Sequence, residues 1–104
     1  MAYSQLSFTQ PVQEAWQGIS DKENDAQTAA IFGVVEANGG EVKVSSFSPS
    51  HLAVVSVIDY PDEKSAQKAV AGVQALGTLE FVSMHHLWDL AEYTAVARKA
   101  AQAS

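Results

Sequence analysis

The segment HLAVVSVIDYPDE, from His51 to Glu63, constrains the fold more than any other part of the chain. Successive side chains of a strand point to opposite faces of the sheet, so a strand with one wet face alternates apolar and polar residues. Here apolar side chains occupy consecutive positions on both sides of Ser56. The segment therefore predicts a strand that is covered on both faces and ends at the Asp-Tyr-Pro-Asp turn.

The length of the chain and its lack of cysteine limit the remaining choices. Its 104 residues fit a single domain over residues 1–104, which can bury one modest core. The absence of cysteine excludes disulfides, thiol nucleophiles and cysteine metal sites together. This composition favours a cytoplasmic location.

The charge of the chain bears on its partners. Twelve acidic residues against six basic ones give a net charge of -6, and Arg98 and Lys99 are the only adjacent basic pair. Nucleic acids and anionic membrane surfaces are bound by basic patches, so we expect neither partner. No apolar run approaches the roughly 20 residues that span a bilayer, and the N-terminus is typical of a mature, soluble protein.

Proline and glycine divide the chain into short units with distinct hydrophobic periods. Strands are predicted over residues 2–8, 41–47, 51–59 and 78–88. Helices are predicted over 20–40, 60–77 and 89–103, with a short helical turn after Thr9. The order is that of a ferredoxin-like βαββαβ sheet, in the α+β class, with an extra C-terminal helix. Two helices cover one face of such a sheet, so the other face must meet water, a ligand or another subunit.

The two-residue period sorts the strand residues into two sets. The first set is purely apolar, and we expect it to lie under the helices: Leu6, Phe8, Val42, Val44, Val55, Val57, Val82 and Met84. The second set mixes apolar and small polar residues: Tyr3, Gln5, Ser7, Lys43, Ser45, Phe47, Val54, Ser56, Ile58, Phe81, Ser83 and His85. A water-facing sheet would carry more charge, so we expect a second copy of the chain to cover this mixed face.

Several motifs between Glu36 and Tyr93 resemble the Gly-Tyr-Asp (GYD) domain family. They are the runs GGEVK, HLAVVSVIDYPDE and ALGTLEFVSMHHL, followed by a late EY, and they include Gly39-Gly40, Lys43, Asp59 and Gly77. The resemblance implies a dimeric α+β barrel, in which two ferredoxin-like sheets pack face to face. Barrels of this kind include cofactor-free monooxygenases, isomerases and small-ligand binders, and a fold of this breadth does not identify one function.

The chain departs from the GYD pattern at the residues that name the family. Where the family has Gly-Tyr-Asp, this chain has SHLA from Ser50 to Ala53, so the acidic group is missing at Ala53. The role of that aspartate cannot be carried over to this chain.

His85 is the candidate catalytic residue. On the mixed face an imidazole can act as a general base or orient a carbonyl, and the alternative role is that of a hydrogen-bonded interface residue. Its neighbour His86 points to the opposite face, so the two cannot readily chelate one metal, and we expect neither a metal nor a cofactor. His51 lies either at the rim of a cavity or simply at the surface.

The candidate ligand-binding residues share the mixed face: Tyr3, Gln5, Lys43, Ser56, Ser83 and His85. Tyr3 either donates to a carbonyl or phenolate or packs in an interface, and Lys43 pairs with a ligand anion or with a carboxylate of another subunit. Asp59 falls on the other side of the strand and is interpreted as a turn acceptor.

These observations lead to three hypotheses. The first is a homodimeric or larger GYD-like assembly that holds a small, partly apolar organic ligand in the barrel. The second is a cofactor-independent isomerase or monooxygenase, in which His85 moves a proton and Tyr3 or Gln5 stabilises an oxyanion. The third is an assembly module without a ligand.

Overall fold

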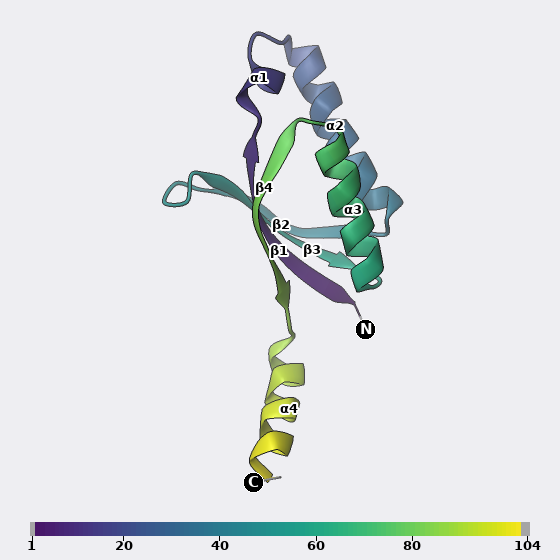
Figure 1. The fold of residues 1–104 in the computed structure, drawn as a ribbon, viewed down its shortest axis with the longest axis vertical. Helices are drawn as coiled ribbons and strands as arrows, with labels where there is room; N and C mark the ends of the chain where they lie inside the picture. Colours follow the sequence, from purple (N-terminus) through teal and green to yellow (C-terminus); the bar gives the residue numbers. More distant parts are fainter. Residues whose placement is uncertain (1, 103–104) are drawn as a thin grey trace.

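The computed structural model describes residues 2–102, which form four strands and four helices (Figure 1). In chain order these are β1 (Tyr3–Pro11), α1 (Gln13–Trp16), α2 (Asp21–Ala37), β2 (Glu41–Ser48), β3 (Ala53–Tyr60), α3 (Glu63–Ala75), β4 (Leu79–Leu87) and α4 (Leu90–Gln102). The predicted α+β class is confirmed. The helical turn expected after Thr9 is present as α1, although Thr9 itself belongs to β1 and Val12 is the residue that precedes the helix.

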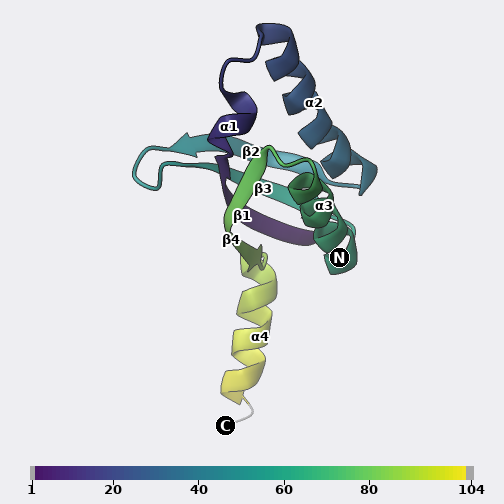
Figure 2. The same cartoon turned by 45° about the horizontal axis from the view of Figure 1, so that its top comes forward.

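The strands form one antiparallel sheet in the order β2-β3-β1-β4. Helices α2 and α3 lie together on one side of this sheet, whereas α4 continues from β4 and extends away from it (Figures 1 and 2). The molecule measures 60 × 31 × 18 Å, and its radius of gyration is 16.4 Å. A compact domain of this length has a radius of gyration of about 13 Å, so the chain is elongated.

Side-chain caps fix where α2 and α3 begin. The Ser20 hydroxyl accepts a hydrogen bond from the Glu23 amide at 3.2 Å, and the Glu23 carboxylate accepts one from the Ser20 amide, which makes a reciprocal capping box. At the start of α3, the Asp62 carboxylate accepts from the Ser65 amide at 2.7 Å. Both helices therefore begin at a residue whose side chain satisfies a free backbone amide of the first turn.

The core lies between α2, α3 and the sheet. Its buried residues are Val35, Tyr60, Ala66, Ala69 and Val73, and Ile31, Ile58 and Phe81 are among the side chains that pack against them. Alanines at two of these α3 positions let the helix approach the sheet closely. Burial of the Tyr60 hydroxyl raises its pKa above the usual value.

The expected assignment of the sheet faces is wrong. Gln5, Ser7 and Ser56, from the mixed set, line a cavity together with side chains of α2 and α3. Their strand neighbours Leu6 and Val57, from the purely apolar set, therefore point to the side that carries no helix. Most of the set that was expected to lie under the helices therefore lies on the uncovered face.

Two β-bulges explain why some residues of each predicted set lie on the opposite face from the rest of their set. Val42 pairs with Ile58 and Val44 with Val57, so Lys43 is an extra residue in β2. In β4, Phe81 pairs with Thr9 and Ser83 with Phe8, which leaves Val82 as the extra residue. A bulge reverses the alternation beyond it. Val44, Ser83 and His85 thereby share the uncovered face, while Val42, Phe81 and Met84 lie on the helix side.

The Asp62 cap predicts a pH dependence of stability. The hydrogen bond from the Ser65 amide holds the pKa of this carboxyl below its usual value. A depressed pKa in the folded state stabilises the fold above the unfolded-state pKa, and this contribution disappears as the pH falls below about 4. We expect Asp62→Asn, which keeps a capping oxygen, to lose less stability than the wild type between pH 5 and pH 3 in urea denaturation. Parallel losses in the two proteins would contradict this assignment.

Candidate functional site

The uncovered side of the sheet is a continuous, mostly apolar surface, called the open face below. Two rows of cross-strand neighbours define it, one from Val44 through Val57 and Leu6 to His85, and one from Ser46 through Val55 and Phe8 to Ser83. The Val44 side chain is 45 % exposed, and Leu6, Phe8, Val55 and Val57 are each only partly buried. An apolar surface of this kind marks a contact site for another molecule.

Polar groups gather at one side of the open face around the Phe8 ring. His85 Nε2 lies 3.2 Å from the Ser83 hydroxyl, and its ring meets Phe8 edge-on at a centroid distance of 6.2 Å. His51 lies on Phe8 at 4.9 Å, and its Nδ1 is 2.9 Å from the Ser48 hydroxyl. This cluster has imidazoles and a hydroxyl, which can bind a carbonyl or transfer a proton once water is excluded.

The structure divides the six expected ligand residues into three groups. Ser83 and His85 lie together on the open face. Tyr3, Gln5 and Ser56 lie on the helix side, where the Tyr3 ring stacks on His86 at 4.1 Å. Lys43, at the β2 bulge, donates to Glu41 at 2.8 Å, and this contact raises the lysine pKa above its usual value. These side chains therefore do not line one cavity.

This separation changes the chemistry available to His85. The proton-transfer hypothesis placed Tyr3 or Gln5 beside His85 to stabilise an oxyanion. The sheet itself lies between them, so any hydrogen-bond donor that acts with His85 must come from Ser83, His51 or another molecule. Asp59 lies on the same side as Val57, as expected, and accepts a 2.5 Å hydrogen bond from the Ser4 hydroxyl.

The described residues were also compared with the requirements of a metal site and of a membrane-spanning helix. Among residues 2–102, no three histidine or acidic side chains come close enough to hold a metal ion. His85 and His86 point to opposite faces, as predicted, because they pair with Leu6 and Gln5 respectively. Over the same residues, no helix has both the length and the apolar character needed to cross a membrane.

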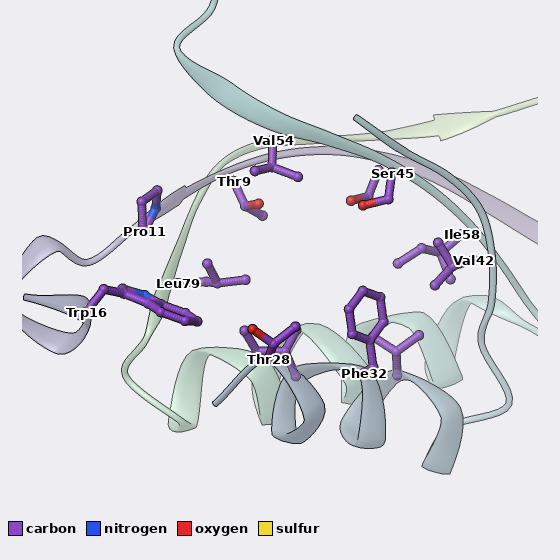
Figure 3. A pocket seen from close by; sticks show the side chains of 13 residues that line it. Thr9, Pro11, Trp16, Thr28, Phe32, Val42, Ser45, Val54, Ile58 and Leu79 are labelled. Carbon is purple, nitrogen blue, oxygen red and sulfur yellow. The ribbon is translucent and has the colours of Figure 1, made fainter. Parts of the chain in front are cut away.

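A pocket on the helix side of the sheet was not anticipated. It has a volume of about 440 Å³ and lies between α2 and the strands, with Trp16 at one end and Phe32 rising from α2 (Figure 3). The Trp16 indole donates to the Thr78 carbonyl at 2.8 Å, which fixes the ring at the pocket wall. Trp16, Thr28 and Ser45 come from three separate elements, so no local sequence motif marks the pocket.

Comparisons with known proteins add no assignment to this geometry. No family model matches the chain, and no curated protein matches it either. The roles of the open face and of the pocket must therefore be argued from their own residues.

Proposed function

We propose that this protein is a homodimeric, GYD-like binding protein that holds a small, partly apolar organic molecule between two sheets. In this arrangement each chain supplies a ferredoxin-like βαββαβ unit, and the open faces of two copies pack together as a dimeric α+β barrel. Ser83 and His85 of both copies then face the space between the sheets.

The observation that carries this proposal is the apolar open face. Burying apolar area contributes roughly 25 cal/mol per Å², and the rows through Val57 and Val55 place five apolar side chains next to one another: Leu6, Phe8, Val44, Val55 and Val57. A symmetric pair places the same surface of each copy on the other, which suits a face that is apolar along its middle rows. The resemblance to the GYD family predicts the same packing.

The Ser83–His85 pair supports ligand binding within such a dimer. A surface used for assembly alone gains nothing from an imidazole and a hydroxyl in its row, because each polar group must be desolvated. A ligand with a carbonyl or hydroxyl group satisfies both when it occupies the barrel. His85 is also the residue that a cofactor-independent isomerase or monooxygenase would use to move a proton, which keeps catalysis as the second candidate.

The dimer can be tested directly. We expect sedimentation velocity of the full chain at micromolar concentration to give the dimer mass, and a crystal structure to show two open faces in contact around a cavity lined by Ser83 and His85. A stable monomer would contradict the proposal. A dimer whose inter-sheet space is filled by its own side chains would favour the assembly module without a ligand.

A further inference from the structure

The pocket between α2 and the sheet, called the hydroxyl pocket below, differs in chemistry from the open face. At about 440 Å³ it falls in the range of small-molecule sites, and its walls are mostly aliphatic and aromatic. Trp16 and Phe32 supply flat apolar surfaces from opposite sides (Figure 3). Flat rings pack on such walls in offset or edge-on geometry.

A row of hydroxyls crosses the floor of this space. Ser45, Ser56 and Thr9 line the pocket from β2, β3 and β1. Ser7, the cross-strand neighbour of Ser56, continues the row into a small adjoining cavity. Within residues 2–102 no hydrogen bond joins any of these four side-chain hydroxyls to another residue, and none of the four is among the fully buried side-chain atoms that lack a partner. The hydroxyls therefore keep access to the space in front of the strands, where they can exchange hydrogen bonds with water or with a ligand.

The residues that line the pocket favour a ligand without a net charge. None of the thirteen residues around the pocket is acidic, basic or a histidine: Thr9, Pro11, Trp16, Thr28, Ile31, Phe32, Val35, Val42, Ser45, Val54, Ser56, Ile58 and Leu79. A buried ligand charge would stay unpaired there, which is strongly unfavourable. Hydroxyls both donate and accept, so they suit carbonyl and hydroxyl oxygens of a neutral molecule.

Helix α2 forms the wall of the pocket opposite the strands. It packs mainly on α3, through close contact of the Val34 side chain with Gly72. Four of its residues line the pocket: Thr28, Ile31, Phe32 and Val35. The Gln27 side-chain amide donates to the Ala15 carbonyl at 3.1 Å, which ties this wall to the segment that carries Trp16.

We propose that the hydroxyl pocket binds a neutral, mostly apolar ring compound that carries a carbonyl or hydroxyl oxygen. The ring system lies between Trp16 and Phe32, and the oxygen meets the Ser45–Ser56–Thr9 row. This site goes beyond the proposed function, because it lies on the sheet face opposite the open face and is complete within one chain.

The neutral fluorescent ketone prodan is a suitable probe for the full-length protein. We expect its emission to shift to the blue and to saturate at one molecule per chain. The anionic dye anilinonaphthalene sulfonate should bind at least about tenfold more weakly, because its sulfonate finds no partner in the pocket. Removing one hydroxyl in Ser56→Ala should weaken prodan binding about fivefold. Absence of saturable prodan binding, or equal binding of the anion, would overturn the proposal.

A neighbouring residue provides a matched control. Ser45→Phe fills the pocket from β2, and Thr28→Phe fills it from α2. Ala30→Phe places the same ring on the exposed side of α2, away from both the pocket and the open face. We expect the two pocket variants to lose at least about tenfold in prodan affinity and Ala30→Phe to retain it. Thr28→Phe tests the site if Ser45→Phe fails to fold, and retention of binding in the pocket variants would refute the site.

The same probe separates this site from the dimer. A variant that dissociates the open faces should still bind prodan, and a wild-type chain that sediments as a monomer but loses prodan on Ser45→Phe would refute the dimer and support the pocket. Loss of prodan binding on dimer dissociation would place the probe between the sheets and overturn the pocket proposal.

Discussion

Gly40→Ala is expected to destabilise the protein by about 3 kcal/mol, because there is no room for a side chain at this position. A Cβ atom on Gly40 would lie 2.6 Å from a methyl group of Val35, 2.8 Å from the Tyr60 ring and 2.9 Å from the Val35 carbonyl oxygen. Both neighbours belong to the buried core, so neither can move aside cheaply. The Gly40 amide also donates to that carbonyl at 2.9 Å, which ties the end of α2 to the start of β2.

Thermal unfolding of Gly40→Ala measures this effect, and we expect a melting temperature lower by about 10 °C or more. Gly33→Ala is the matched control. A Cβ atom at Gly33 meets nothing within 4 Å, and the residue lies inside α2, where alanine is the better helix former. Gly33→Ala should therefore stabilise the protein by about 0.5 to 1 kcal/mol. A Gly40→Ala melting temperature equal to the wild type would show that the turn between α2 and β2 can relax.

The order of elements could be predicted from the sequence because local physics decides it. Apolar positions recur with different periods in helices and strands, and Ser20, Asp62 and Gly39 stand at the ends of helices where their side chains or backbone are suited to end them. None of these sequence patterns depends on how the helices pack on the sheet. The element boundaries that they predict are therefore found in the folded chain.

The choice of the covered face could not be predicted in the same way. Apolarity indicated that Leu6 and Val57 are buried by something, but it did not indicate whether helices or another subunit do so. The bulges at Lys43 and Val82 carry no glycine or other mark in the sequence, so the residues beyond them were assigned to the wrong side. Ser83 and His85 were correctly placed together because no bulge separates them.

Because the helices cover the face that was expected to be open, small polar residues lie beneath them. The helix-covered side holds the core but also carries the Ser45–Ser56–Ser7 row, whereas the apolar residues Leu6, Val55 and Val57 lie on the side without a helix. Each face of the sheet thus has groups that other residues of the same chain do not cover or satisfy. The open face lacks a cover, and the hydroxyl row lacks hydrogen-bond partners.

The C-terminal helix adds to the case for a second chain. No residue of α4 is buried, and Leu90, Tyr93 and Val96 are 75 %, 56 % and 49 % exposed. An isolated helix of this length is marginal in water, so α4 gains most of its stability from packing. In a dimer, the apolar side of this helix has a further surface on which to pack.

Val57→Glu is expected to dissociate the proposed dimer while leaving the chain folded. Val57 lies in the middle of the open face, between Val44 and Leu6 in its row, and in the isolated chain it is only partly buried. A glutamate there reaches water in the monomer. Between two packed sheets its charge has no partner, and symmetry places one such charge on each side, so we expect a loss of at least about 3 kcal/mol of association energy.

That loss corresponds to a dissociation constant raised by at least about 100-fold, which sedimentation equilibrium measures. Ala30→Glu adds the same charge on the exposed side of α2 and should sediment as the wild type does. Circular dichroism should show the same secondary structure for all three proteins, which separates dissociation from unfolding. An unchanged dimer in Val57→Glu would mean that the open face is not the interface, because two unpaired carboxylates at its centre cannot be accommodated at so small a cost.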